Sequence, residues 1–338
     1  MVLQAAGLRD KGVAVPNGVC PNVAAAIELS GNRPVFVDPD PETYGLSSAV
    51  LAACKEPFAA VVAVHAYGSL CDMAGLASFC AQGGAVLIED FAVAQGATIA
   101  GRPAGSFGLA SVVSFGAGKV AAHGAGGAIL TDDEALDREV GRLDAALPAF
   151  SEPSRAAAEA LSARFKALYN AQLDGRVAAP WREWPAASAA LAPGLLHRFA
   201  PEWERPIAER LQRLDALVEG RRAKAARLTA LLEGIDGLVV VAAPAGSVPW
   251  RLNALVERGR DELLRRLWKS GLKASSWYGP RDLYFRPPEA RPAPMPRGDA
   301  FGRQVVNLWV NEEVDEAYLA AAASAARDLL RRPAISRG

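Results

Sequence analysis

The sequence has few of the residues that build metal centres or disulfide frameworks. It contains three histidines and four cysteines (Cys20, Cys54, Cys71 and Cys80) among 338 residues. The cysteines lack the close pairing of metal ligands, so we expect reduced thiols and no metal site. Net charge is also missing, because 37 basic residues balance 37 acidic ones. With no basic tract, the chain is not expected to bind nucleic acid or an anionic membrane.

Long apolar runs are absent as well. No stretch approaches the roughly 20 apolar residues of a membrane span, and the first residues do not have the layout of a signal peptide. A hydrophobic content of 51% without a short repeat excludes collagen-like, coiled-coil and disordered classes. We therefore expect a soluble, cytoplasmic protein of two domains, since one domain averages about 150 residues.

Short apolar runs alternate with helical patterns over residues 13–146. Strand patterns lie at 13–15, 34–37, 59–64, 85–88, 111–114 and 128–131. Helical patterns separate most of them, and Asp132 or Asp133 is suited to cap a helix that runs through Val140. This alternation predicts an α/β domain with a mostly parallel sheet.

The C-terminal part has a different pattern. A long amphipathic helix is predicted from Pro206, with Arg and Lys on its solvated face. Further strand, helix and loop patterns lie at 238–242, 253–256, 261–270, 280–298, 304–309 and 314–330. We predict a large α/β domain over residues 1–203 and a small α+β domain over 204–338. Residues 147–203, rich in Ala, Pro and Trp, show no clear period.

Polar residues end or follow several predicted strands, namely Asp38, His65, Asp90 and Ser114. Parallel sheets bind ligands beyond the carboxyl ends of their strands, so these side chains could converge on one site. Each of them alone is equally well explained as a solvated strand end. For His65, a core histidine with satisfied hydrogen bonds is the main alternative.

A lysine lies in a glycine-rich stretch after these strands. Lys119 is flanked by five glycines between residues 116 and 127, and glycine lets loop backbone approach a ligand closely. An Asp, a Ser and such a Lys would suit pyridoxal phosphate. The Asp would keep the pyridine nitrogen protonated, the Ser would contact the phosphate, and the Lys would form the Schiff base. A surface loop is the alternative for a glycine-rich turn with one lysine. The stretch also lacks the residue spacing of a Walker A phosphate-binding loop.

Four segments carry a resemblance to a known family: VFVDPDPETYGL, VVAVHAYGSLCDM, IEDFAVAQGATIAGRPAGSFG, and SFGAGK with GGAILT. They are similar in order and spacing to the sugar aminotransferases named for DegT, DnrJ, EryC1 and StrS. Two later segments, HRFAPEWERPIAERLQRLDALVEGRR and RDELLRRLWKSGLKAS, resemble the family's small domain. The resemblance implies an aspartate-aminotransferase-like fold (fold type I) and pyridoxal 5′-phosphate. It also implies a homodimer that transfers an amino group, typically from glutamate, to a keto group of a nucleotide-linked sugar or similar small metabolite.

Carried over by position, the resemblance assigns residues to the cofactor. Lys119 matches the lysine that forms the Schiff base and moves the proton, and Asp90 matches the carboxylate on the pyridinium nitrogen. Ser114 matches a serine that contacts the phosphate. Cys20 stands where an aromatic residue commonly stacks on the ring, although some members have a similar Cys-Pro.

The sequence departs from the family pattern at other positions. Val93 replaces a cofactor-binding Gln, and Leu196 replaces an Asn that reaches the phosphate from the neighbouring subunit. The family's phosphate-binding turn would precede Val2, and we expect it to be absent. Each lost contact is worth on the order of 1 kcal/mol, so we expect weaker cofactor binding.

Candidates for substrate contact are His65, His123, Trp277 and Tyr278. The Trp277–Tyr278 pair follows a predicted helix where the family approaches its substrate, and His123 could equally lie on a loop surface. Core or subunit-interface positions are the general expectation for the tryptophans, namely Trp181, Trp184, Trp203, Trp268, Trp277 and Trp309.

Two functions remain open from the sequence. The first is a pyridoxal-phosphate aminotransferase, favoured because Asp90 and Lys119 are both kept. The second is a non-catalytic descendant that serves as a binding or assembly partner, favoured by the departures at Val93 and Leu196. A dehydratase on the same scaffold is disfavoured, because those relatives replace the lysine.

Overall fold

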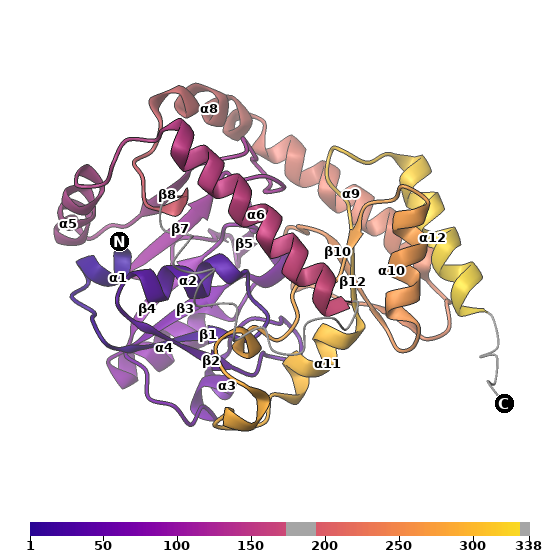
Figure 1. Ribbon diagram of the computed structural model, residues 1–338, viewed down its shortest axis with the longest axis horizontal. Helices are drawn as coiled ribbons and strands as arrows, with labels where there is room; N and C mark the ends of the chain where they lie inside the picture. The colour runs from indigo at the N-terminus through magenta and orange to yellow at the C-terminus, as the bar shows by residue number, and fades with distance from the viewer. Residues whose placement is uncertain (174–193, 332–338) are drawn as a thin grey trace.

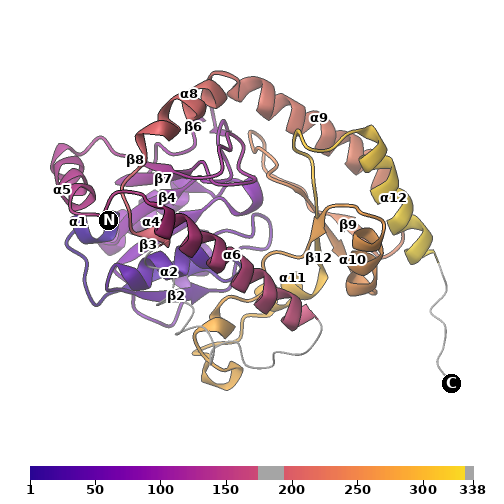
Figure 2. The same cartoon turned by 45° about the horizontal axis from the view of Figure 1, so that its top comes forward.

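The computed structural model describes residues 1–173 and 194–331 of the chain. Two sheets organise them, one in the first 130 residues and one after residue 237, with a long helix crossing from one to the other (Figures 1 and 2). No helix in these two ranges is both long and apolar enough to cross a membrane.

The first sheet has six strands, in the order β2 (Arg33–Val37), β1 (Gly12–Pro16), β3 (Ala60–Val64), β4 (Val86–Asp90), β7 (Ala110–Ser114) and β8 (Gly127–Leu130). The first five are parallel, and β8 pairs antiparallel at the edge. The residues of β1 and β3 are buried throughout, which is why these strands read as continuous apolar runs. The predicted α/β class with a mostly parallel sheet is confirmed.

Alternate residues of these strands enter two different cores, because successive side chains of a strand point to opposite faces. Val13 and Val15 pack under α1 (Val2–Ala5), α2 (Pro21–Leu29) and α5 (Glu134–Ala145). Ala14 packs on the other face, under α3 (Ser48–Ala52) and α4 (Met73–Gly83). Helices therefore cover both faces of the sheet, and its carboxyl edge is left for a site. A small hairpin, β5 (Thr98–Ile99) and β6 (Arg102–Pro103), lies between β4 and β7.

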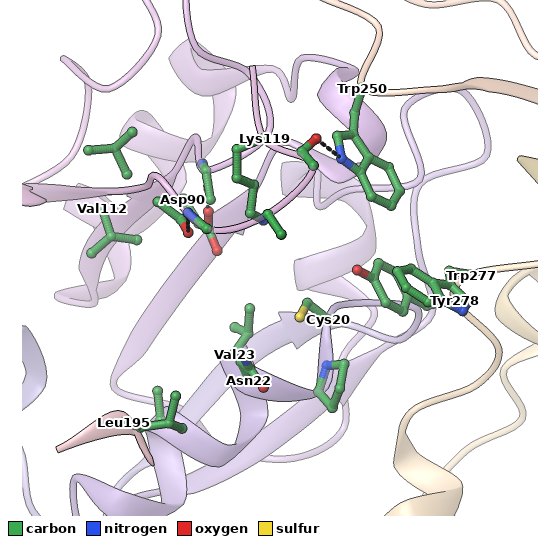
Figure 3. Close-up of a pocket in the computed structure, with 18 of the residues that line it drawn as sticks. Cys20, Asn22, Val23, Asp90, Val112, Lys119, Leu195, Trp250, Trp277 and Tyr278 are labelled. Atoms are coloured by element: carbon green, nitrogen blue, oxygen red, sulfur yellow. Dashed lines mark hydrogen bonds between the residues drawn. The ribbon is translucent and has the colours of Figure 1, made fainter. Parts of the chain in front are cut away.

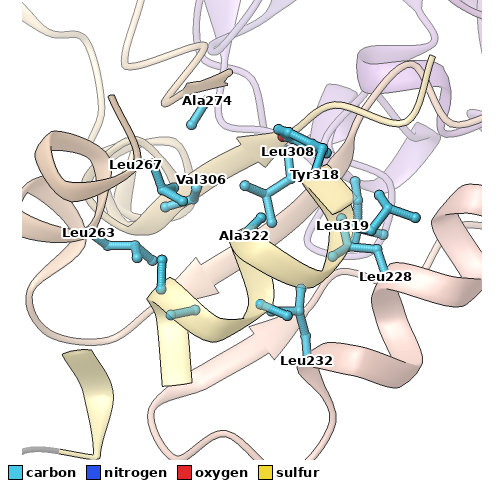
Figure 4. Close-up of a cluster of buried hydrophobic side chains, with 14 of the residues drawn as sticks. Leu228, Leu232, Leu263, Leu267, Ala274, Val306, Leu308, Tyr318, Leu319 and Ala322 are labelled. Atoms are coloured by element: carbon cyan, nitrogen blue, oxygen red, sulfur yellow. The ribbon is translucent and has the colours of Figure 1, made fainter. Parts of the chain in front are cut away.

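The second sheet has four antiparallel strands, in the order β11 (Ala274–Ser275), β12 (Val305–Leu308), β10 (Leu252–Val256) and β9 (Leu238–Val240). It packs against α10 (Arg260–Lys269), α12 (Glu316–Leu330) and the end of α9 (Leu214–Leu232). Figure 4 shows the core that they enclose, built from leucines of these helices and from Val306 and Leu308 of β12. The strand and helix patterns predicted here are confirmed, whereas the two-residue β11 is too short to leave a pattern.

Other elements differ from the predicted pattern. The helix predicted from Pro206 is two helices, α8 (Glu204–Gln212) and α9, which follow a short turn, η2 (Pro201–Trp203). The unassigned middle contains α6 (Glu152–Leu173). The proline-rich stretch holds two short turns, η3 (Asp282–Tyr284) and η4 (Pro288–Ala290), and leads into α11 (Pro296–Gln304). This stretch returns to the first sheet, where Phe285 meets Phe36 with ring centroids 5.1 Å apart. The domain boundary at residue 203 stays a prediction.

Candidate functional site

A cavity of about 1140 Å³ lies at the carboxyl edge of the first sheet, between that sheet and the second (Figure 3). Its wall on the first sheet includes Asp90 at the end of β4, Ser114 at the end of β7, and Lys119 in the loop that follows. Cys20, which precedes α2, lies on the same cavity. The wall on the second sheet includes Trp250, Arg251, Trp277 and Tyr278. The structure thus brings six of the predicted site residues, Cys20, Asp90, Ser114, Lys119, Trp277 and Tyr278, to one space.

Asp90 is a buried acid beside a lysine. Its side chain is 8% exposed, and Oδ1 accepts a hydrogen bond of 2.9 Å from the backbone N–H of Ala92. Burial raises the pKa of Asp90, while the Ala92 N–H and the charge of Lys119 act to lower it. Figure 3 places the Asp90 and Lys119 side chains on the same side of the cavity. The site therefore offers an acid and an amine to one ligand.

The loop that carries Lys119 is closed at its base. The carbonyl of Phe115 accepts hydrogen bonds from the backbone N–H groups of His123 and Gly124, at 2.8 and 2.9 Å. Gly118 has a φ of +80°, a left-handed conformation that favours glycine directly before the lysine. Ser114 Oγ accepts a bond of 3.2 Å from Gly116 N–H. Gly118 and the hydrogen bonds at the base of the loop therefore shape a tight turn around Lys119; the close approach to a ligand stays a prediction.

Three side chains from other elements also hold this loop. Gln95 donates to the carbonyl of Ser114 at 3.3 Å and accepts from Ala121 N–H at 2.8 Å. Trp250 Nε1 donates to the carbonyl of Gly118, and Arg221 Nη2 donates to the carbonyl of Lys119, both at 2.9 Å. Sequence reasoning missed all three. Gln95 lies two residues beyond the position that the family resemblance had marked, and no local pattern marks the other two.

The opposite wall is aromatic. The rings of Trp250, Trp277 and Tyr278 stack with centroids 5.6 to 6.4 Å apart and interplanar angles of 8° to 22°. The guanidinium of Arg251 lies 3.9 Å from the ring centroid of Trp250 and 3.4 Å from that of Trp309. Such contacts hold a cation on an apolar wall through the quadrupole of the rings.

The tryptophans differ in where they lie. Trp268, Trp277 and Trp309 line the cavity with Trp250, and Trp277 and Trp309 are partly buried against the neighbouring cores. Trp203 is a core residue, buried against Ile207 and Val120. A role of any tryptophan at a subunit interface stays a prediction, and Trp181 and Trp184 lie outside the described residues.

Three other predicted residues do not line the cavity. His65 is fully buried: Nδ1 accepts from Cys71 N–H at 3.1 Å, so Nε2 carries the proton and donates to Glu89 at 2.8 Å. His65 is thus a core histidine with satisfied hydrogen bonds. His123 lies beside Trp203, with ring centroids 6.4 Å apart. Val93 packs against the aromatic cluster around Tyr67 and Trp250.

Asp38 and Leu196 also lie away from the cavity wall. Asp38 accepts from the backbone N–H of Gly298 at 2.9 Å, in the first turn of α11. It therefore ties the C-terminal part of the chain to the end of β2. Leu196 is 38% exposed.

A family model matches residues 1–153, the part of the chain that contains the first sheet, Asp90 and Lys119. The model is that of the DegT/DnrJ/EryC1/StrS aminotransferase family. The resemblance recognised in the sequence motifs is confirmed.

Curated relatives of the chain include a "Pleiotropic regulatory protein" of Geobacillus stearothermophilus. It is 29% identical over 306 residues, which are 87% of this chain and 71% of that protein. A dTDP-3-amino-3,4,6-trideoxy-alpha-D-glucose transaminase of Micromonospora megalomicea subsp. nigra is 40% identical over 139 residues. That match covers 40% of this chain and 37% of the transaminase. The chain thus spans much of the first relative and little more than a third of the second.

Solved structures of the family have the same fold. The crystal structure of DesV from S. venezuelae, determined in complex with a ketimine intermediate, aligns with a TM-score of 0.76 and 24% identity. The alignment covers 98% of this chain and 82% of that one. The fold of the sugar aminotransferases (fold type I), predicted from the sequence, is confirmed.

Proposed function

We propose that the chain is an aminotransferase that uses pyridoxal phosphate and acts on a keto group of a nucleotide-linked sugar or a similar small metabolite. The placement of Asp90 and Lys119 on one wall of one cavity carries the proposal. A buried carboxylate is unfavourable unless something cationic or hydrogen-bonding faces it. A ligand with a protonated ring nitrogen would meet that need, and the lysine lies within electrostatic range of the acid.

The residues around the cavity fit this cofactor at its ring. Asp90 would hold the proton on the pyridine nitrogen, and Lys119 would bind the aldehyde carbon through Nζ. Ser114 Oγ is the candidate to hold the phosphate, and Cys20, on the same cavity, would contact the ring. When bound, the cofactor supplies an electron sink for the bonds of the substrate's amino-bearing carbon.

The chain's own groups would then move one proton and exclude water. Lys119 Nζ would carry a proton between the substrate carbon and the aldehyde carbon of the cofactor, as a general base and then a general acid. The stacked Trp277 and Tyr278 would cover the substrate from the second sheet. Burial raises the pKa of Tyr278 well above its ordinary value, so its hydroxyl stays protonated and can donate to a substrate oxygen. Of the two remaining candidates, His123 lies at the base of the lysine loop, and His65 follows β3 and contacts Glu89 of β4.

The proposal also includes the substrate class, the oligomeric state and the location of the protein. The transaminase of Micromonospora is 40% identical to this chain over 139 residues, which supports a sugar substrate with an amino donor such as glutamate. We also propose a homodimer, which sedimentation or light scattering would test. All four cysteines are free thiols, which supports a location in the reducing cytoplasm.

Chemical trapping tests the central assignment. Purified protein is mixed with pyridoxal phosphate, reduced with borohydride and digested, and the modified lysine is identified by mass spectrometry. We expect the cofactor on Lys119 and its loss in Lys119→Ala, whereas Lys55→Ala, at an exposed position, keeps the modification. Unmodified Lys119 at saturating cofactor would overturn the proposal.

A second function has some support of its own. The relative aligned over most of this chain is named a regulatory protein, and Val93 and Leu196 are apolar where the family resemblance implies cofactor contacts. A non-catalytic binding partner would retain the cavity without amino transfer. Glutamate separates the two functions: an aminotransferase converts the bound cofactor to its amine form and releases 2-oxoglutarate, and a non-catalytic descendant does neither.

A further inference from the structure

Two side chains tie the lysine loop to the second half of the chain. Trp250 Nε1 donates to the carbonyl of Gly118 at 2.9 Å (dashed line in Figure 3), and Arg221 Nη2 donates to the carbonyl of Lys119 at 2.9 Å. Arg221 Nη1 also donates to the carbonyl of Trp250, at 2.8 Å. The three hydrogen bonds thus link Arg221 to the backbone of Trp250 as well as linking both side chains to the loop.

Arg221 is placed at an energetic cost. Its side chain is among the buried ones, with 4% exposed, and the acceptors of its hydrogen bonds are backbone carbonyls. Burial lowers the pKa of Arg221 to about 10. A charged guanidinium in such a place is tolerated only where its donors are satisfied, because desolvation is otherwise uncompensated. Its position is therefore tightly specified by the two carbonyls.

The helix beneath Arg221 is anchored on both sides of it. Val218, one turn earlier in α9, packs with Val120 and Ala121 next to the lysine. Leu228, two turns later, is fully buried in the core of the second sheet. Gly96 permits the close approach of α9 to the first half of the chain, since a Cβ there would lie 2.7 Å from Val218. A helix held in this way gives Arg221 little freedom to follow the loop.

We propose that Arg221 and Trp250 form a clamp, hereafter the lysine clamp, that fixes the loop around Lys119 and thereby directs its amine into the cavity beside Asp90. Arg221 is then a positioning residue and does not touch the substrate. The clamp is a property of the loop in this chain, and its chemical consequence rests on the function proposed above.

The neighbouring arginine provides a matched control. Arg222 lies on the same helix and also donates to backbone carbonyls, those of Gly246 and Ser247, at 3.0 and 3.2 Å. It makes no such bond to the lysine loop. Arg221→Met and Arg222→Met therefore remove comparable groups from adjacent positions, and only the first opens the clamp. Arg221→Lys keeps the charge, but an ammonium group lacks the planar guanidinium fork that bonds the carbonyls of Trp250 and Lys119 together.

Two readouts test the clamp, and the first needs no cofactor. Hydrogen exchange of the backbone amides over residues 114–124 is expected to accelerate at least about tenfold in Arg221→Met and to stay at the wild-type rate in Arg222→Met. The second is the rate at which pyridoxal phosphate becomes fixed to Lys119 by borohydride. We expect this rate to fall in the order wild type, Arg221→Lys, Arg221→Met, with Arg222→Met at the wild-type rate. A general loss of stability would slow both methionine variants alike.

The outcomes separate the two proposals. If the loop exchanges at the wild-type rate in Arg221→Met, the clamp is refuted, whether or not the cofactor binds. If the exchange accelerates but wild-type Lys119 never takes up the cofactor, the proposed function fails while the clamp stands. If Arg221→Met does not fold, Trp250→Phe removes the indole donor while keeping an aromatic ring at this position, and faster exchange of the loop is again expected. Wild-type exchange in Trp250→Phe would then refute the clamp.

Discussion

Gln95 is a single residue on which the lysine loop depends from the side of the first sheet. Its amide satisfies the buried N–H of Ala121 and the carbonyl of Ser114. Gln95→Leu keeps the size of the side chain and leaves both groups without their partner, so we expect a loss of about 1–3 kcal/mol in the free energy of unfolding. Urea denaturation measures it. Gln82→Leu is the control, because the amide of Gln82 meets only Ser78 on an exposed face; equal losses in the two variants would contradict the prediction.

Glu89 is a buried carboxylate that makes stability depend on pH. Burial alone would raise its pKa, but hydrogen bonds from His65 and from the N–H groups of Gly105 and Phe107 lower it below the ordinary value of 4.5. A group with a depressed folded pKa stabilises the fold above its unfolded pKa, and that contribution is lost as pH falls through the folded pKa. The stability difference between wild type and Glu89→Gln should therefore be full at neutral pH and shrink below about pH 4. Denaturation curves at several pH values test this, and a difference that does not change with pH would refute it.

At the scale of elements, α9 shows why part of the site could not be predicted. A strand buried on both faces is a short apolar run, and a polar residue at its end stands out, so Asp90 and Ser114 could be marked from the sequence. On α9, the apolar stripe predicted that all Arg and Lys lie on the solvated face. This is wrong for Arg221, because the helix packs against two cores and uses a second face between them. Contacts that depend on the meeting of distant segments leave no periodic pattern.

The two ends of α9 should be separable by mutation. Leu228→Ala empties a fully buried position in the core of the second sheet and should lower the free energy of unfolding by about 2–5 kcal/mol. Arg221 lies two turns before Leu228, where α9 keeps its anchor through Val218 in the other core, so amide exchange over residues 114–124 should stay at the wild-type rate under native conditions. Leu211→Ala, at a position 42% exposed, is the control for stability. Faster exchange of the loop in Leu228→Ala would mean that the helix transmits the loss from one end to the other.

On the scale of the whole molecule, the site is assembled from two halves that the sequence describes separately. The first sheet supplies the acid and the lysine, and the region of the second sheet supplies the aromatic wall. The sequence motifs identified the first half, because most of the segments that resemble the family lie there. Trp250, which closes the cavity, lies more than a hundred residues beyond Lys119 and has no motif around it. Its contact with the lysine loop and with the cavity depends on how the two sheets pack in three dimensions.

The proline-rich stretch, residues 280–298, holds the C-terminal half against the first sheet. One buried ion pair in this stretch provides a test of that role. Asp282 is fully buried and accepts from Asn17 at 2.7 Å and from Arg291 at 2.9 Å; Arg291 also binds Asp299 at 2.7 Å. Arg291→Met leaves the Asp282 carboxylate buried without its cation, so we expect a loss of about 3–5 kcal/mol in the free energy of unfolding. Arg142→Met removes an exposed two-bond contact to Glu139 and should change the free energy of unfolding far less, because solvent screens an exposed ion pair. Similar changes in the two variants would show that this stretch does not hold the C-terminal half against the first sheet.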